Sequence, residues 1–196
     1  MELTKNDAVL VIDVQNDFCP GGALAVRSGD VVAAAMSQAV KAFAAKGATV
    51  FTTQDWHPDK HSSFKDQGGQ WPPHCVHGTK GADLHPALKL PKGTHAVKKG
   101  ASLDKDAYSG FVDSDLEQQL KKANISRVFV GGLATDYCVF NTVIDALGLG
   151  FETYVFTDAV AAINIEPGDG LRALHLMEGS GATLVTTDEV IAEPQS

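Results

Sequence analysis

The run from Ala8 to Ile12 restricts the fold most strongly, because every side chain in it is apolar. A strand with one solvated face alternates apolar and polar residues, whereas a strand buried on both faces reads as a continuous apolar run. Other elements must therefore cover both faces of the sheet that contains it. Parallel sheets whose strands are joined by crossover helices meet this requirement.

Further strands and helices are predicted to alternate along the chain. Short apolar or β-branched runs at 48–53, 95–99, 127–130, 151–157 and 183–185 predict five more strands. Helices are predicted at 30–46, 113–123, 136–149 and 167–178, and Thr187 or Asp188 begins a last short one. The alternation predicts a single α/β domain over residues 1–196, with an open, mostly parallel six-stranded sheet and helices on both faces.

One long segment, about 55–94, has no clear periodicity and is rich in Gly, Pro and His. Loops of this length inside a compact domain are uncommon and usually functional. The segment also carries Trp56, Phe64 and Trp71, whose large aromatic side chains favour burial. We therefore expect a functional loop here and no domain boundary.

Composition excludes several classes of partner. The net charge of −8 argues against nucleic acid and against an anionic membrane surface. The first residues lack the apolar core of a signal peptide, and no apolar run approaches membrane-spanning length. Three widely spaced cysteines, Cys19, Cys75 and Cys138, fit a reducing cytoplasm better than a disulfide framework. No pattern marks an interface, so a homo-oligomer stays open.

The stretch from Gly131 to Val139 joins a predicted strand to a predicted helix. The two glycines are expected to end the strand in a tight turn, with Thr135 or Asp136 as the helix N-cap. Cys138 then lies in the first helical turn, where free N–H groups and the helix dipole favour a thiolate and could hold an oxyanion. The alternative is a small buried cysteine that packs an ordinary strand–helix turn.

Four chemically capable residues each follow a predicted strand: Asp13, Asp55, Lys99 and Cys138. Sites in open parallel sheets form outside the carboxyl ends of the strands, so these residues should meet at one edge. Cys138 would be the nucleophile, Asp13 would carry its proton, and Lys99 would offset the carboxylate charge. The alternatives are a turn carboxylate at Asp13 and a solvated strand-end lysine at Lys99.

A second group has the composition of a metal site. Asp55 and His57 are two residues apart in an extended segment, and His74 follows a stiff Pro-Pro pair. Two imidazoles and one carboxylate would leave positions open for water and substrate, and they suit several divalent ions. His61 is either a fourth ligand or a loop histidine bonded to the backbone. Hydrogen-bonded loop residues remain the alternative for the whole group.

Taken together, these motifs resemble the nicotinamidase/pyrazinamidase branch of the isochorismatase-like cysteine hydrolases. The resemblance covers about residues 8–189. It is carried by Asp13 to Phe18, Gln54 to Pro58, Trp71 to Val76 with Gly78 and Thr79, Lys99 with Gly100, Ala107 to Phe111, and Gly131 to Val139. Six stretches in the same order are specific, although each alone is weak.

The resemblance implies hydrolysis of nicotinamide, and of pyrazinamide, through a thioester, with a place in NAD salvage. It assigns the catalytic triad to Asp13, Lys99 and Cys138, the oxyanion hole to the N–H groups of Ala134 and Cys138, and the metal to Asp55, His57 and His74. The metal would be a single divalent ion, zinc in the first place, with iron or manganese as alternatives. The substrate pocket would comprise Phe18, Trp71, Tyr108, Leu133, Ala134 and Tyr137, with a cis peptide at Leu133-Ala134.

Two other functions remain open. An amidohydrolase of the same fold that acts on carbamoyl or ureido compounds would share Asp13, Lys99 and Cys138 without needing the metal ligands. A non-catalytic ligand-binding relative is the other alternative, although such a protein is expected to have lost part of the triad. True isochorismatases are disfavoured because they lack a nucleophile at the position of Cys138.

Overall fold

The computed structural model describes residues 1–191, and its six strands form one sheet in the order β3-β2-β1-β4-β5-β6. The strands are β1 (Asp7–Ile12), β2 (Thr49–Asp55), β3 (His95–Lys99), β4 (Arg127–Leu133), β5 (Glu152–Ala161) and β6 (Thr183–Val185). The helices are α1 (Gly29–Ala45), α2 (Leu116–Lys122), α3 (Phe140–Gly148), α4 (Asp169–Gly179) and α5 (Thr187–Ile191). Every neighbouring pair of strands is parallel, which confirms the predicted sheet.

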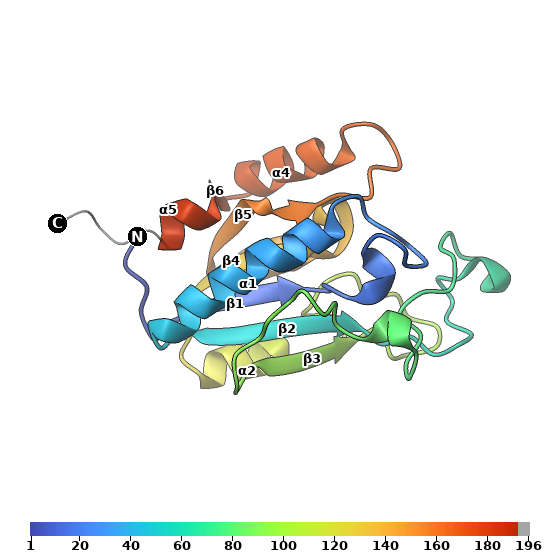
Figure 1. The fold of residues 1–196 in the computed structure, drawn as a ribbon, viewed down its shortest axis with the longest axis horizontal. Coiled ribbons are helices and arrows are strands. Elements are labelled where there is room, and N and C mark those ends of the chain that lie inside the picture. Colours follow the sequence, from blue (N-terminus) through green and yellow to red (C-terminus); the bar gives the residue numbers. More distant parts are fainter. Residues whose placement is uncertain (192–196) are drawn as a thin grey trace.

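Helices cover both faces of the sheet, giving three layers (Figure 1). On one face, α1 and α5 bury residues such as Met36, Phe43 and Val190 in one hydrophobic cluster. On the other face, α2, α3 and α4 contribute to a second cluster that includes Leu120 and Val143. The central strand β1 is buried along its whole length, as its apolar run predicts. No helix among residues 1–191 has the length and apolarity needed to cross a membrane.

The glycines of β4 act differently from the prediction. Gly131 and Gly132 continue the strand to Leu133, with a register shift against β5, so the expected strand end at Val130 was wrong. A Cβ atom on Gly132 would lie 2.1 Å from the carbonyl oxygen of Ile12, and one on Gly131 would lie 2.4 Å from the sulfur of Met36. The glycines therefore allow β1 and α1 to approach β4 closely.

The predicted N-caps were also wrong. Ala134 occupies the N-cap position of the short π-helical turn η4 (Thr135–Val139), which leads into α3. The carboxylate of Asp136 instead accepts hydrogen bonds from the backbone N–H groups of Ile163 and Asn164, at 3.0 and 2.8 Å. It thereby fixes the segment that follows β5. Helix α2 begins at Leu116, later than the predicted residue 113.

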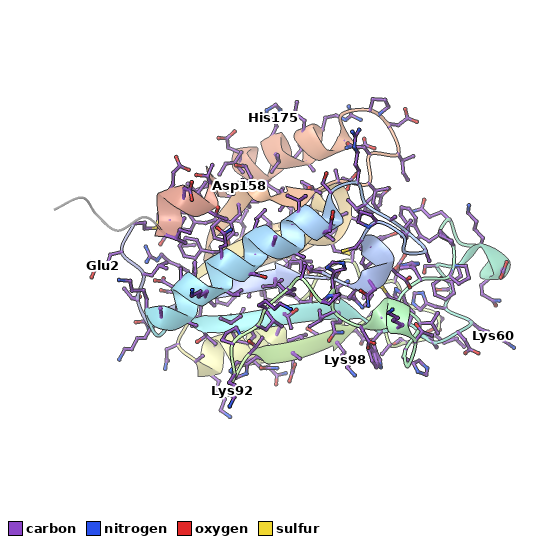
Figure 2. All side chains as sticks on the ribbon, in the orientation of Figure 1. Glu2, Lys60, Lys92, Lys98, Asp158 and His175 are labelled. Atoms are coloured by element: carbon purple, nitrogen blue, oxygen red, sulfur yellow. The ribbon has the colours of Figure 1, made fainter. Side chains whose placement is uncertain are left out.

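The first part of the segment between β2 and β3 folds beyond the carboxyl ends of the strands, and its last part runs back along the sheet, beside α1, to the start of β3 (Figure 1). It contains the single 3-10 turns η2 (Lys65–Gln67) and η3 (Lys80–Ala82), and a similar turn, η1 (Asn16–Phe18), follows β1. An isolated β-bridge pairs His57 with Val76, so the two ends of the stretch 57–76 lie side by side. Lys60 lies toward its outer tip (Figure 2). The segment therefore has a defined backbone structure, held by turns and isolated bridges, next to the carboxyl edge of the sheet.

Candidate active site

The structure brings together the four residues predicted to meet at the carboxyl edge of the sheet. Asp13 follows β1, Asp55 ends β2, Lys99 ends β3, and Cys138 lies in η4 after β4. All four are buried, with Asp13 and Lys99 fully removed from solvent. Adjacent parallel strands thus deliver one polar side chain each to the same interior space.

Lys99 lies at the centre of this group. Its ammonium is 2.9 Å from Asp13 Oδ2 and 2.5 Å from Asp55 Oδ1, and 3.5 Å from the Cys138 sulfur. It also donates a hydrogen bond to the carbonyl oxygen of Ala107 at 2.9 Å. Burial opposes the charged form, but the two carboxylates raise the pKa of Lys99 well above its usual value. Lys99 therefore stays cationic.

The preceding lysine, Lys98, does not reach this group. Lys98 is exposed, and its ammonium lies 3.3 Å from the ring centroid of Trp56, on the outside of the sheet edge (Figure 2). Successive strand side chains point to opposite faces, so only Lys99 reaches the buried group.

The Cys138 thiol is held in its protonated form. Burial raises its pKa well above the usual value; the charge of Lys99 lowers it, while those of Asp13 and Asp55 raise it further. The sequence interpretation of a helix start that favours the thiolate is therefore insufficient, because desolvation outweighs it here. A nucleophile at this position needs a nearby base.

Asp13 has a defined orientation. The hydroxyl of Thr53 donates a 2.7 Å hydrogen bond to Asp13 Oδ1 and accepts one of 3.2 Å from the Asp13 backbone N–H. Burial raises the pKa of Asp13, against the lowering effect of Lys99. A raised pKa makes a carboxylate a stronger proton acceptor than an exposed one. Asp13 is thus suited to proton transfer beside Cys138.

Asp55, His57 and His74 form a group whose ligand atoms all lie within 4.8 Å of one another. The ring Nδ1 of His57 lies 2.9 Å from the carbonyl oxygen of Gly100, and that of His74 lies 2.8 Å from the carbonyl of Pro72. A carbonyl only accepts, so Nδ1 carries a proton in both rings, and in the neutral form of each ring Nε2 keeps its lone pair. These residues fit a divalent metal ion, since such hydrogen bonds typically orient histidine ligands.

The charges of this group also suit a cation. The Asp55 side chain raises the pKa of His57 against the opposing effect of burial, while burial lowers the pKa of His74. A proton and a metal ion therefore compete for Nε2 of His57, but His74 is neutral and ready to ligate.

His61 differs from these ligand candidates. Its Nδ1 lies 2.8 Å from the Ser63 hydroxyl and its Nε2 lies 3.2 Å from the carbonyl oxygen of Lys105. The ring stacks on that of His57, with centroids 4.2 Å apart. Service as a fourth ligand requires release of the bond to Lys105 or Ser63, and it stays a prediction.

A small cavity connects the nucleophile group, which comprises Asp13, Lys99 and Cys138, with the metal-ligand group, which comprises Asp55, His57 and His74. It is lined by Phe18, Leu24, Asp55, Trp71, His74, Tyr108, Ala134, Tyr137, Cys138 and Ile163. The indole N–H of Trp71 donates to the Tyr108 hydroxyl at 3.0 Å, and the Tyr137 ring packs edge-on against Trp71 with centroids 5.0 Å apart. The cavity is thus flanked by linked aromatic side chains.

Most predicted pocket residues line this cavity. Leu133 is not among the lining residues, because its side chain is fully buried in the core beside Gly29. The peptide bond between Leu133 and Ala134 is cis, as the resemblance implies. The sequence did not predict that Leu24 and Ile163 line the cavity. The strand β5 was predicted to end at residue 157, whereas it continues to Ala161, so Ile163 was not recognised as a residue near a strand end.

Gln15 is a further site residue that the sequence did not reveal. Its side-chain amide donates to the Asp55 carbonyl oxygen at 2.8 Å and accepts from the Asp55 N–H at 2.8 Å, and it also donates to the Ala82 carbonyl. The buried amide therefore fixes the backbone of Asp55. The position of Gln15, a polar residue just after the buried strand β1, could have indicated that it belongs to the site.

The fold and the site define a class: a parallel α/β protein with a buried Cys-Lys-Asp cluster beside a His/Asp metal-ligand group. Residues 7–189 match the Isochorismatase domain family. The chain is 40% identical to a nicotinamidase of Escherichia coli over 200 aligned residues, which cover 91% of this chain and 94% of that protein. It is 41% identical to a nicotinamidase/pyrazinamidase of Mycobacterium tuberculosis, covering 91% and 97%.

The solved structures agree with these relatives. The pyrazinamidase of Pyrococcus horikoshii in complex with zinc superposes with a TM-score of 0.89 at 42% identity, covering 92% of this chain and 99% of that one. The chain therefore belongs to the isochorismatase family.

Proposed function

We propose that this protein is a nicotinamidase, which hydrolyses nicotinamide to nicotinic acid and ammonia and also accepts pyrazinamide. The main observation that supports this proposal is that Cys138 and the metal-ligand candidates Asp55 and His74 line the same small cavity. Nicotinamide could contact both groups at once, because it has a reactive carboxamide carbonyl and a pyridine ring nitrogen. The names of the similar proteins support the proposal.

Substrate binding follows from the walls of the cavity. The aromatic side chains of Phe18 and Trp71 would flank the ring of the substrate, burying its apolar faces. Asp55, His57 and His74 would hold the metal ion, zinc in the first place. When bound, the ion supplies a Lewis-acid position for the ring nitrogen, which orients the carboxamide toward Cys138.

Acylation begins with the Cys138 thiol, which burial keeps protonated. The S–H proton passes to Asp13, and the sulfur electron pair forms a bond to the carboxamide carbon. The N–H groups of Ala134 and Cys138 would receive the oxyanion; loss of one such donor typically costs about 3 kcal/mol in the barrier. Asp13 then gives its proton to the leaving nitrogen as the C–N bond breaks, and ammonia and a thioester result.

Deacylation reverses the proton movements. Asp13 removes a proton from water, the hydroxide oxygen attacks the thioester carbon, and the C–S bond breaks to release nicotinic acid. The thiolate takes the proton back from Asp13. Lys99 stays charged throughout and offsets the negative charge that moves between Asp13 and Cys138, from 2.9 and 3.5 Å.

The deciding experiment is ammonia release from nicotinamide by the purified protein, before and after metal removal by a chelator. Release that falls after chelation and returns with zinc supports both the thiol chemistry and the metal. Release that is indifferent to verified metal removal rejects the metal's role. No release from the zinc-loaded protein contradicts the nicotinamidase proposal.

A carbamoyl or ureido amidohydrolase is the second candidate, because it would use the same Asp13, Lys99 and Cys138. The metal-ligand group and the aromatic walls of the cavity favour an aromatic amide instead. Turnover of a carbamoyl compound in the absence of nicotinamide turnover would favour this candidate. Metal binding with no amide turnover of either kind would favour a non-catalytic ligand-binding protein.

The setting of this activity is part of the proposal. Nicotinic acid is a precursor that NAD salvage consumes, and a reducing compartment such as the cytoplasm would keep the nucleophilic thiol free. The three cysteines are unpaired, in agreement with such a compartment. We propose that the chain acts as a single hydrolase domain, because four adjacent strands of one sheet position Asp13, Asp55, Lys99 and Cys138.

A further inference from the structure

One threonine contacts Asp13 twice. Thr53 lies on β2, is 1% exposed, and points into the same space as Asp13. Its hydroxyl accepts from the Asp13 backbone N–H at 3.2 Å and donates its single proton to Asp13 Oδ1 at 2.7 Å. The two bonds close a small ring, so the carboxylate cannot rotate without breaking one of them.

The other carboxylate oxygen has a different environment. Among residues 1–191, Asp13 Oδ2 is the buried side-chain oxygen or nitrogen atom that lacks a hydrogen-bond partner, although Lys99 Nζ lies at ion-pair distance, 2.9 Å. A carboxylate oxygen of Asp13 lies within 4.8 Å of the Cys138 sulfur. Because the Thr53 hydroxyl already donates to Oδ1, Oδ2 is the oxygen that lacks a hydrogen-bond donor and can receive a proton.

We propose that Thr53 is a positioning residue that assigns the mobile proton of the reaction to Oδ2 of Asp13. A proton on Oδ1 would point at the Thr53 hydroxyl proton, and the hydroxyl would then have to turn and lose its acceptor inside the protein. Such a buried unsatisfied donor typically costs about 1–3 kcal/mol. A proton on Oδ2 leaves both Thr53 bonds intact.

The inference rests on the proposed thiol chemistry and makes one step of it specific. The S–H bond of Cys138 breaks as the Oδ2–H bond of Asp13 forms, and the sulfur keeps the electron pair for attack on the carbonyl carbon. The same Oδ2–H bond later breaks to protonate the leaving nitrogen. Thr53 touches neither sulfur nor substrate in this scheme, so its effect passes through Asp13.

Thr53→Val tests the proposal, because valine keeps the branched shape and removes the hydroxyl. Two rates are measured: kcat and KM for nicotinamide, and alkylation of Cys138 by iodoacetamide in the free protein, followed at that residue by mass spectrometry. We expect kcat and the alkylation rate each to fall at least about tenfold, with KM within about twofold. Thr53→Ser keeps the hydroxyl and should restore both rates to within about threefold of the wild type.

Thr52→Val is the matched control. Thr52 lies on the same strand with the same 1% exposure, but the alternation of the strand turns it to the other face, where its hydroxyl makes only a 3.4 Å contact to the Thr53 carbonyl. It should leave kcat and alkylation unchanged. If Thr53→Val does not fold, Thr53→Ala replaces it, with the same expected loss and the same rescue by serine.

Several results would overturn the inference. These are unchanged or faster alkylation in Thr53→Val, a change in KM alone, or a serine variant as impaired as the valine variant. Failure of the proposed function looks different: the wild type would not hydrolyse nicotinamide, yet the alkylation rates of the variants would still follow the predicted order.

Discussion

The Lys99 ammonium lies 2.5 Å from Asp55 Oδ1. This contact joins the nucleophile group, to which Lys99 belongs, with the metal-ligand group, to which Asp55 belongs. The other oxygen, Oδ2, lies 3.6 Å from Nε2 of His57. Burial alone would raise the pKa of Asp55, but Lys99 and His57 hold it far below its usual range. Asp55 is therefore an ionised link between the two halves of the site.

Lys99→Met should abolish turnover and destabilise the fold, because Asp13 and Asp55 would lose the buried ammonium that pairs with both of them. Loss of one partner of a buried ion pair costs about 3–5 kcal/mol, measurable by urea unfolding. Lys98→Met is the control. The exposed Lys98 side chain lies over the Trp56 ring, so its loss should lower the unfolding free energy by no more than about 1 kcal/mol. Equal stability of the two variants would contradict the role of Lys99.

Cys138→Ala should eliminate ammonia release while nicotinamide still binds, because the cavity walls and metal ligands remain. Binding can be measured by calorimetry on the metal-loaded protein. Cys19→Ala is the matched control: burial raises the pKa of the Cys19 thiol to about 11, and this residue is not among those that line the cavity. It should retain turnover. Activity of Cys138→Ala near that of the wild type would reject the nucleophile.

His74→Ala should lower metal affinity at least about tenfold, since it removes an imidazole whose Nε2 is free to ligate. Elemental analysis after dialysis against a weak chelator gives the metal content per chain. His61→Ala addresses the fourth ligand by the same measurement: unchanged metal content would exclude His61, and a comparable loss would include it. Full occupancy in His74→Ala would remove His74 from the ligand set.

Gly100→Ala should weaken metal binding through His57. Gly100 has a φ of +63°, and a Cβ atom there would lie 2.6 Å from Cε1 of His57, so the ring must move. Gly93→Ala separates the two effects, because its φ is +85° but nothing lies within 4 Å of the added carbon. Both variants should lose stability, typically about 1 kcal/mol or more. Only Gly100→Ala should lose metal affinity, and equal metal affinity in both would contradict the clash.

The Asp7–Arg127 pair predicts a pH dependence of stability away from the site. Burial opposes ionisation, but two hydrogen bonds from Arg127 and one from the Thr4 N–H leave the pKa of Asp7 below its usual value. A lowered pKa contributes stability above the unfolded pKa of about 3.9, and that contribution is lost as pH falls through the folded pKa.

Asp7→Asn should therefore cost about 1.5–3 kcal/mol at pH 7, the usual range for hydrogen bonds to a charged group. The difference in unfolding free energy from the wild type should shrink below pH 4. Glu117→Gln breaks the exposed pair with Lys121 and should cost less than about 1 kcal/mol at any pH. A difference for Asp7→Asn that is constant with pH would contradict the ion pair as its source.

Much of the architecture could be predicted because apolar runs report burial directly. The run from Ala8 to Ile12 indicated a strand covered on both faces, and the other strands followed from similar runs. Gly131 and Gly132 were misinterpreted because a glycine that allows close approach and a glycine that ends a strand look alike in sequence. The difference depends on Ile12 and Met36, which are far away along the chain.

The site could be predicted only in part, for the same physical reason. Residues at the carboxyl ends of strands, such as Asp13 and Lys99, are located by the sheet itself. Thr53 and Gln15 act through hydrogen bonds to residues 40 positions away, and their own types are common in strands and turns. Leu24 and Ile163 line the cavity because of where their loops pass, and no local pattern encodes that.

The hydrogen bonds from His57 to the Gly100 carbonyl and from His74 to the Pro72 carbonyl have a consequence for inherited variation. Both acceptors belong to the main chain, so no codon change can delete either oxygen. Mutation can reach these bonds only indirectly, by displacing the backbone or pushing a ring aside. The choice of tautomer is therefore robust to genetic drift, even where the neighbouring side chains are free to diverge.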